Sequence, residues 1–140
     1  MTNIVVGVDG SDTARQAAEA AAEMARRYDS TLHLVMSVPK VTVDSVGGPE
    51  AFTVSSFELA EQALLRLSSE LKGDTALQVT TAAVVGDPAS ALCEQARSVD
   101  AWVIIVGNKR TQGMARVLGS VATDVVKAAP CAVHIVHTFP

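Results

Sequence analysis

Two segments of this 140-residue chain combine glycine with residues that could bind an anion. The first runs from Gly7 to Ser11 and the second from Gly107 to Ser120. Glycine lets backbone N–H groups approach an anion closely, and the first turn of a helix presents N–H groups that have no partner within the helix. Because Gly119 and Ser120 stand where we expect a helix to begin, we predict that they bind a phosphate group.

The second segment also gathers positive charge. Lys109, Arg110 and Arg116 are three of only 11 basic residues in a chain whose formal charge is −4. Local charge of this kind suits a polyphosphate, and we include these residues and Gly113 in the predicted site. The alternative interpretation is that the glycines only shape turns and that the basic side chains are solvated.

Asp9 lies between the two glycines of the first segment, and its type allows three roles. The carboxylate could bond an adenosine, hold Mg²⁺ through a water molecule, or serve as a turn residue. The patterns G-x-x-x-x-G-K-[ST], G-x-G-x-x-G after the first strand and G-x-S-x-G do not occur. Their absence argues against a P-loop NTPase, a Rossmann-type dinucleotide-binding protein and an α/β-hydrolase.

The histidines and cysteines give little sign of a metal or catalytic site. His134 and His137 lie on one expected strand, where residues three apart point to opposite faces. His33 lies inside another strand and is expected in the core or at an interface. Cys93 and Cys131 form no C-x-x-C pair, so we expect two small buried side chains in a reducing compartment rather than a disulfide. The sequence places no serine, histidine and acidic residue for a nucleophilic triad.

The elements that would position these segments alternate along the chain. Consecutive apolar positions are typical of strands that helices cover on both faces, and the segments between them have helical spacing. This alternation predicts an α/β fold, a doubly wound sandwich of three layers with a mainly parallel five-stranded sheet, in one domain over residues 1–140. The expected strands are Asn3–Val8, Thr31–Val38, Leu77–Val85, Ala101–Val106 and Ala132–His137.

Four helices are expected between the strands. The first covers Asp12–Tyr28 with Ser11 as its cap, and the third follows the cap Asp87 with Pro88 in its first position. The second is expected to open with a capping box at Ser55–Glu58 and to stop at Gly73, which leaves Pro39–Val54 as a long irregular connection. The fourth covers Ser120–Ala128. The residues expected to face the sheet are Ala14, Ala17, Ala18, Ala21, Met24, Ala25 and Tyr28, then Ala60, Ala63, Leu64, Leu67 and Leu71, then Ala91, Leu92 and Ala96, and finally Val121, Val125 and Ala128.

Net charge and hydropathy argue against several classes of protein. A formal charge of −4 argues against nonspecific binding to nucleic acid or anionic lipid. The apolar runs are far shorter than the roughly 20 residues that span a bilayer, and Met1–Asn3 leads into a strand without a basic segment. We therefore expect a cytoplasmic protein without a membrane segment.

Four stretches of the sequence together resemble the universal stress protein family, over the whole length of the chain. They are Ile4–Ser11, Val85–Pro88, Val106–Val121 and Ala129–Val136. The resemblance implies the strand order 3-2-1-4-5, a homodimer that pairs the last strands over residues 132–137 and, in one subclass, a site for ATP or AMP with Mg²⁺. By position, the phosphates would lie on Gly107, Gly119 and Ser120, and the adenosine against Asp9, the backbone near Ser37 and Val38, and Gly86.

The chain departs from the family's pattern at Arg110, where the pattern has a glycine three residues after Gly107. Arg110 could swing out and contact the phosphates, or it could fill the site so that the nucleotide is lost or changed. Replacing Arg110 with glycine separates the two hypotheses, because ATP binding weakens in the first case and strengthens in the second.

These observations leave three hypotheses for the function. The first is a regulatory stress-response protein that binds an adenine nucleotide as a homodimer, with at most weak ATP hydrolysis. The second is a dimeric interaction protein that binds no nucleotide and docks on partner proteins, using residues 39–54. The third is an enzyme of the adenine-nucleotide α-hydrolase type, ranked last because its S-G-G-x-D-S loop is absent and Val8–Asp12 stand there instead.

Overall fold

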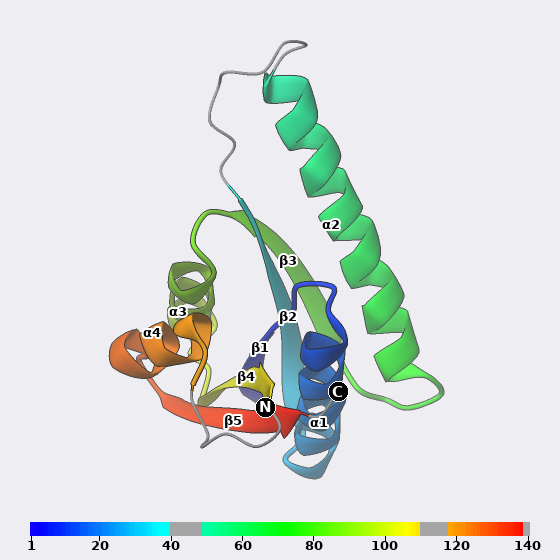
Figure 1. The fold of residues 1–140 in the computed structure, drawn as a ribbon. Helices are drawn as coiled ribbons and strands as arrows, with labels where there is room; N and C mark the ends of the chain where they lie inside the picture. Colours follow the sequence, from blue (N-terminus) through cyan, green and yellow to red (C-terminus); the bar gives the residue numbers. More distant parts are fainter. Residues whose placement is uncertain (40–48, 110–117, 139–140) are drawn as a thin grey trace.

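The computed structural model describes residues 1–39, 49–109 and 118–138, without the side chains of residues 49–55 and 109. Its elements alternate strictly between strand and helix (Figure 1). In chain order they are β1 (Thr2–Gly7), α1 (Asp12–Arg27), β2 (Ser30–Val38), α2 (Pro49–Lys72), β3 (Val79–Val85), α3 (Pro88–Ser98), β4 (Val103–Lys109), α4 (Ser120–Ala128) and β5 (Ala132–Thr138).

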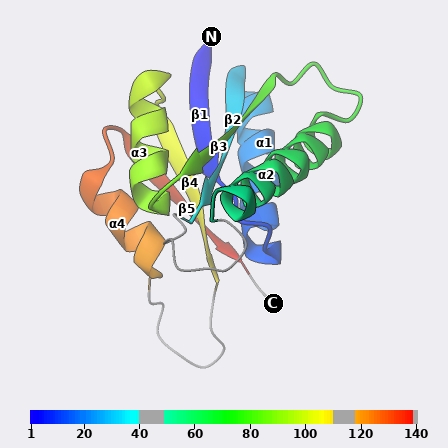
Figure 2. The ribbon, with the colours of Figure 1, turned by 90° about the horizontal axis from the view of Figure 1, so that it is seen from above.

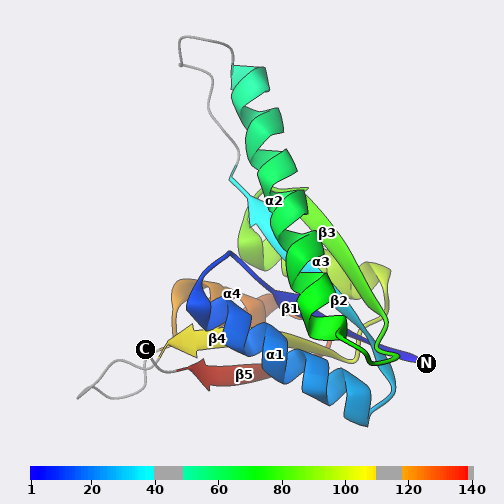
Figure 3. The same ribbon diagram turned by 90° about the vertical axis from the view of Figure 1, so that its right-hand side faces the viewer.

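The five strands form one parallel sheet in the order β3-β2-β1-β4-β5. Helices α1 and α2 cover one face of the sheet and α3 and α4 cover the other (Figure 2). Seen from the side of α1 and α2, these two helices lie in front of the sheet (Figure 3). The predicted three-layer α/β sandwich and its strand order are therefore confirmed.

The core has two halves, one on each face of the sheet. Neighbouring residues of β1 point to opposite faces, so Ile4 and Val6 pack under α1 and α2 while Val5 packs under α3 and α4. Alanines form the buried side of α1, and their small side chains let the helix approach the sheet closely. A charge on either inner face would therefore have no water to solvate it.

Two of the three predicted helix N-caps are confirmed, Ser11 and Asp87. The Ser11 hydroxyl accepts the N–H of Ala14 at 3.1 Å at the start of α1. The Asp87 carboxylate accepts the N–H of Ser90 at 3.0 Å, and Pro88 occupies the first position of α3. These two caps fix where the chain leaves the carboxyl edge of the sheet and enters the helices.

Two predicted boundaries were wrong. Helix α2 begins at Pro49, so the proposed capping box Ser55–Glu58 lies inside the helix; proline is well tolerated at a first position because its missing N–H has no partner there. Strand β4 continues past Val106 to Lys109, because the ladder with β5 pairs residues 107–109 with residues 136–138. The remaining strand limits lie within two residues of the predicted ones.

Three residues predicted to face the sheet do not. Tyr28 follows the last residue of α1 and is 63% exposed. Its ring packs edge-on against the ring of Trp102, with the two ring centroids 5.2 Å apart. On the short helix α4 the buried side consists of Ala122 and Val125, whereas Val121 and Ala128 are exposed. The other predicted core positions on the four helices are buried or partly buried.

Among the described residues, no helix is long and apolar enough to cross a membrane.

Candidate functional site

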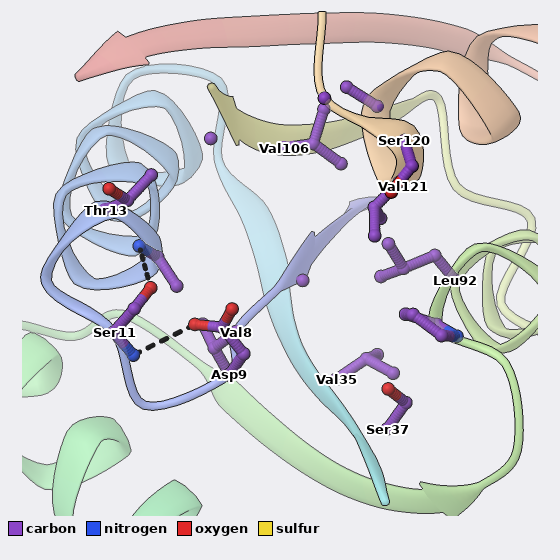
Figure 4. Close-up of a pocket in the computed structure, with 16 residues that line it drawn as sticks. Val8, Asp9, Ser11, Thr13, Val35, Ser37, Leu92, Val106, Ser120 and Val121 are labelled. Atoms are coloured by element: carbon purple, nitrogen blue, oxygen red, sulfur yellow. Dashed lines mark hydrogen bonds between the residues drawn. The ribbon is translucent and has the colours of Figure 1, made fainter. Parts of the chain in front are cut away.

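A cavity opens at the carboxyl edge of the sheet, between the ends of β1 and β4 (Figure 4). From β1 the chain goes to β2 on one side, while β4 lies on the other, so this is the point where the strand order reverses and where open α/β sheets bind ligands. Its volume of about 330 Å³ is in the range of small-molecule sites. Its walls are Gly7, Val8, Asp9, Ser11, Thr13, Ala14, Val35, Ser37, Pro88, Leu92, Val106, Gly107, Gly119, Ser120, Val121 and Ala122.

The turn between β1 and α1 forms one wall, and Asp9 holds this turn in place. Its Oδ1 accepts the N–H of Ser11 at 2.9 Å, and Gly10 has a φ of 84°. The left-handed backbone at Gly10 favours glycine because a side chain there would be strained. Of the three roles considered for Asp9, the turn role is therefore realised. A carboxylate has about four acceptor positions, so the turn leaves room for a ligand contact.

The floor of the cavity is apolar. The side chains of Val35, Val106 and Leu92 line it from β2, β4 and α3 (Figure 4). A Cβ at Gly7 would lie 2.9 Å from Cδ1 of Leu92, so glycine is what lets the leucine reach the strand. The hydroxyl of Ser37 adds a polar group at the end of β2. Such a floor with a few polar groups around it suits a flat heteroaromatic ring.

Gly107 lines the cavity but has a separate structural reason to be glycine. A Cβ at this position would lie 3.0 Å from the carbonyl oxygen of Thr13 and 3.2 Å from Cβ of Ala17. Helix α1 therefore packs directly on the backbone of β4. The sequence shows that residue 107 is a glycine, but it does not show that α1 is the segment that packs against it.

The start of α4 forms the wall opposite Asp9. Gly119 precedes the helix with extended backbone (φ −64°, ψ 166°), and it has no side chain to cap the N–H groups of the first turn. Its own N–H donates to Oδ1 of Asn108 at 2.9 Å. The next N–H groups, those of Ser120 and Val121, belong to residues that line the cavity. This helix end presents N–H donors and the positive end of the helix dipole to an anion.

Charge in the described part of the cavity comes from one ionisable side chain, Asp9. An anionic ligand would therefore depend on the backbone donors and dipole of α4 for its stabilisation by the described residues. Lys109 lies in β4, but its side chain is outside the described part of the chain. Arg110, Gly113 and Arg116 also lie outside the described residues.

The cavity brings together five of the residues predicted from the sequence, Asp9, Ser37, Gly107, Gly119 and Ser120. Val38 and Gly86 are not among its walls. They join each other instead, since the N–H of Gly86 donates to the carbonyl of Val38 at 2.9 Å, and Gly86 needs its glycine because its φ is 137°.

Sequence reasoning missed several residues of the site. Thr13, Pro88, Leu92 and Val121 line the cavity, and Asn108 supports the start of α4. Asn108 did offer a signal, because it is a polar residue two positions after an apolar run. The others became site residues only through the packing of the helices.

Comparison with known proteins agrees with this architecture. The model of the universal stress protein family matches residues 1–137. The chain belongs to the universal stress protein family. Among curated proteins, it is 30% identical over 137 residues to a universal stress protein of Methanocaldococcus jannaschii, a match that covers 95% of this chain and 80% of the relative.

Solved structures of universal stress proteins share the fold. The UspA protein of Lactobacillus plantarum is 25% identical with a TM-score of 0.81, and the match covers 96% of this chain and 97% of the other. A universal stress protein solved in complex with cAMP is 25% identical with a TM-score of 0.73, covering 98% and 97%. Further neighbours with the same fold but lower identity were solved with dAMP, from Archaeoglobus fulgidus, and with AMP, from Arabidopsis thaliana.

Proposed function

We propose that this universal stress protein binds an adenine nucleotide, ATP or AMP, in the cavity between β1 and β4. The observation that carries the proposal is the arrangement of one apolar floor between two different polar walls. Asp9 and Ser37 lie on the side of β1 and β2, and the uncapped start of α4 lies on the other side. A nucleotide has the same division into an apolar base, a polar ribose and an anionic phosphate.

In the proposed binding mode, the base lies on the floor formed by Val35, Leu92 and Val106. The ribose lies near Asp9 and Ser37, and the phosphates lie at Gly119 and Ser120, where backbone donors face them. The sequence-derived part of the proposal adds the backbone at Val38, Gly86 and Gly107 and the residues Lys109, Arg110, Gly113 and Arg116. Mg²⁺ would accompany ATP on its phosphates.

We propose a regulatory rather than a metabolic role, in which the nucleotide stabilises one conformation of the cavity walls. The ligand joins the turn after β1 to the start of α4, two segments that the sheet order brings together. Because it contacts both, it favours the conformation in which they are correctly spaced. ATP hydrolysis is at most weak in this proposal, and the protein acts in the cytoplasm.

We also propose that the protein acts as a homodimer through β5. This strand forms one edge of the sheet, where its outer N–H and C=O groups are open to another strand. Helix α4 packs against β5, and its residue Val126 is 51% exposed. Antiparallel pairing of two β5 strands would extend the sheet across the dimer and cover these groups.

The test of nucleotide binding has two parts. Nucleotide released from freshly purified protein is identified by mass spectrometry, and ATP, AMP and adenosine are titrated into nucleotide-free protein by calorimetry. We expect a bound adenine nucleotide or saturable binding of one ligand per chain. A protein that carries none and binds none of the three would contradict the proposal and favour the interaction protein that docks on partners without nucleotide.

A further inference from the structure

We propose that Asn108 is a positioning residue of this site, which holds the start of α4 against the end of β4 and so sets the affinity for the ligand's phosphates. The proposal rests on the nucleotide-binding function proposed above and adds a residue that does not itself line the cavity. It acts through Gly119, whose N–H donates to Oδ1 of Asn108 at 2.9 Å.

The backbone of Asn108 is fixed by its place in the sheet. It lies in β4 and is in register with His137 of β5. Asn108 is only 6% exposed, so its side-chain amide needs hydrogen bonds to offset the loss of water. The hydrogen bond to Gly119 is therefore anchored on a rigid element at one end and on the first turn of a helix at the other.

The direction of the Asn108 side chain follows from its neighbour. A Cβ on Gly107 would point at Thr13 and Ala17 of α1, on one face of the sheet. Successive strand residues alternate between faces, so the side chain of Asn108 points to the other face, where α4 lies. This alternation explains how one strand end supports both walls of the cavity: α1 packs on Gly107 and α4 is held by Asn108.

The geometry of α4 makes this support important for phosphate binding. Gly119 offers no side-chain cap, and α4 is a short helix of nine residues. With its N–H satisfied by Asn108, Gly119 directly precedes Ser120 and Val121, the two residues of the first turn that line the cavity. Phosphate binding depends on the position of these donors, whereas the proposed adenosine contacts come from β1, β2, β4 and α3 and not from α4.

The test compares Asn108→Ala and Asn108→Asp with the wild type and with the matched control Asn3→Ala. Asn3 is also a hydrogen-bonded asparagine, since its Nδ2 donates to the Val99 carbonyl at 2.8 Å, but it does not line the cavity. Each variant is titrated with ATP, AMP and adenosine by calorimetry. Hydrogen exchange of the Gly119 amide is followed by NMR, and thermal unfolding reports stability.

For Asn108→Ala we expect ATP affinity to fall by about tenfold or more, as for outer residues that orient a ligand-binding group, with adenosine affinity within about twofold of wild type. The Gly119 amide should exchange at least about tenfold faster. Asn108→Asp retains the acceptor oxygen and should restore the slow exchange. Asn3→Ala should change neither the preference for ATP over adenosine nor the exchange of Gly119.

Three results would overturn the proposal. The first is wild-type ATP affinity in a folded Asn108→Ala variant. The second is unchanged Gly119 exchange in that variant. The third is an equal loss for ATP and adenosine, which would show a general structural effect of Asn108. A wild-type protein that binds no nucleotide would contradict the proposed function itself and this inference with it, and is distinguished from the other three because it appears before any substitution.

Discussion

Gly107 and Gly119 both belong to the predicted phosphate site, but the structure constrains them differently. Around Gly107 the backbone and side chains of α1 occupy the space that a Cβ would need. At Gly119 a Cβ would have Oδ1 of Asn108 at 3.7 Å as its one close neighbour among the described atoms, which is ordinary contact. Substitution at Gly119 therefore reports on ligand binding, whereas substitution at Gly107 reports on the stability of the fold.

We predict that Gly119→Val abolishes nucleotide binding while the protein remains folded. The branched side chain would stand where a phosphate approaches the backbone of α4, and the φ of −64° at this position suits any residue. Calorimetry with ATP, on protein whose circular dichroism is native, measures the effect. Ser120→Ala, which removes a hydroxyl but keeps the backbone donors, should be milder. Wild-type ATP affinity in Gly119→Val would remove α4 from the site.

We predict that Gly107→Ala lowers the free energy of unfolding by about 1–3 kcal/mol, the usual cost of adding a methyl group to a packed interior. The new Cβ would lie 3.0 Å from the Thr13 carbonyl and force α1 away from β4. Urea unfolding of the ligand-free protein measures this change, with Gly119→Ala as the matched control. Equal stability of the two variants would show that α1 moves away without cost.

His33 connects three strands through its ring nitrogens. Nδ1 lies 2.6 Å from Thr80 Oγ1 and Nε2 lies 2.9 Å from Asn3 Oδ1. Because the Asn3 oxygen can only accept, Nε2 carries the proton and the neutral ring has a partner at both nitrogens. Burial lowers the pKa of His33 from its usual value of 6.5. In the unfolded chain the ring takes up a proton more readily than in the folded protein.

We therefore predict that the contribution of His33 to stability is present above pH 6.5, the usual pKa, and is lost as the pH falls below it. The midpoint of thermal unfolding, measured between pH 7.5 and pH 5, should decline less steeply in His33→Gln than in wild type. His134→Gln, at an exposed position of β5, is the control. A wild-type slope in His33→Gln would show that burial does not favour the neutral ring.

At the scale of elements, the sequence predicted whether a segment is a helix or a strand better than it predicted where the segment begins and ends. Helix α1 and the end of strand β1 were predictable because the apolar stripe of α1 and its capping residue Ser11 indicate the same helix start. Helix α2 was not, because the first turns after Pro49 lack the apolar spacing that marks its later part. Strand β4 was predicted to stop at Val106, where the apolar run ends, but pairing with β5 extends it through Gly107 and Asn108.

The edge strand β5 carries the prediction for the dimer. A charge at Ile135 is the obvious choice from the sequence, but Ile135 packs on the core under α3 and α4, so the charge would also weaken the fold. Val126, which is exposed, is the better position. We predict that Val126→Asp shifts the protein from dimer to monomer in sedimentation at micromolar concentration, with little change in thermal stability. A monomeric wild type would contradict the proposed dimer.

At the scale of the whole molecule, the cavity exists because the strand order of the parallel sheet reverses between β1 and β4. The sequence predicted which two loops meet there, since parallel strands place their following loops at one edge. It could not predict the floor, because Leu92 reaches the cavity only through the packing of α3 against Gly7. It also could not separate the structural glycine, Gly107, from Gly119, where space remains open.

The central claim is that an adenine nucleotide binds in this cavity, and NMR titration of the labelled protein with ATP tests it most directly. The account predicts that the backbone amide signals of Asp9, Ser37, Gly119 and Ser120 shift together with one dissociation constant. The indole signal of Trp102, the single tryptophan, should stay in place, because Trp102 lies before β4, at the opposite edge of the sheet. Signals at the cavity that do not move at saturating ATP, or movement confined to the Trp102 edge, would contradict the account.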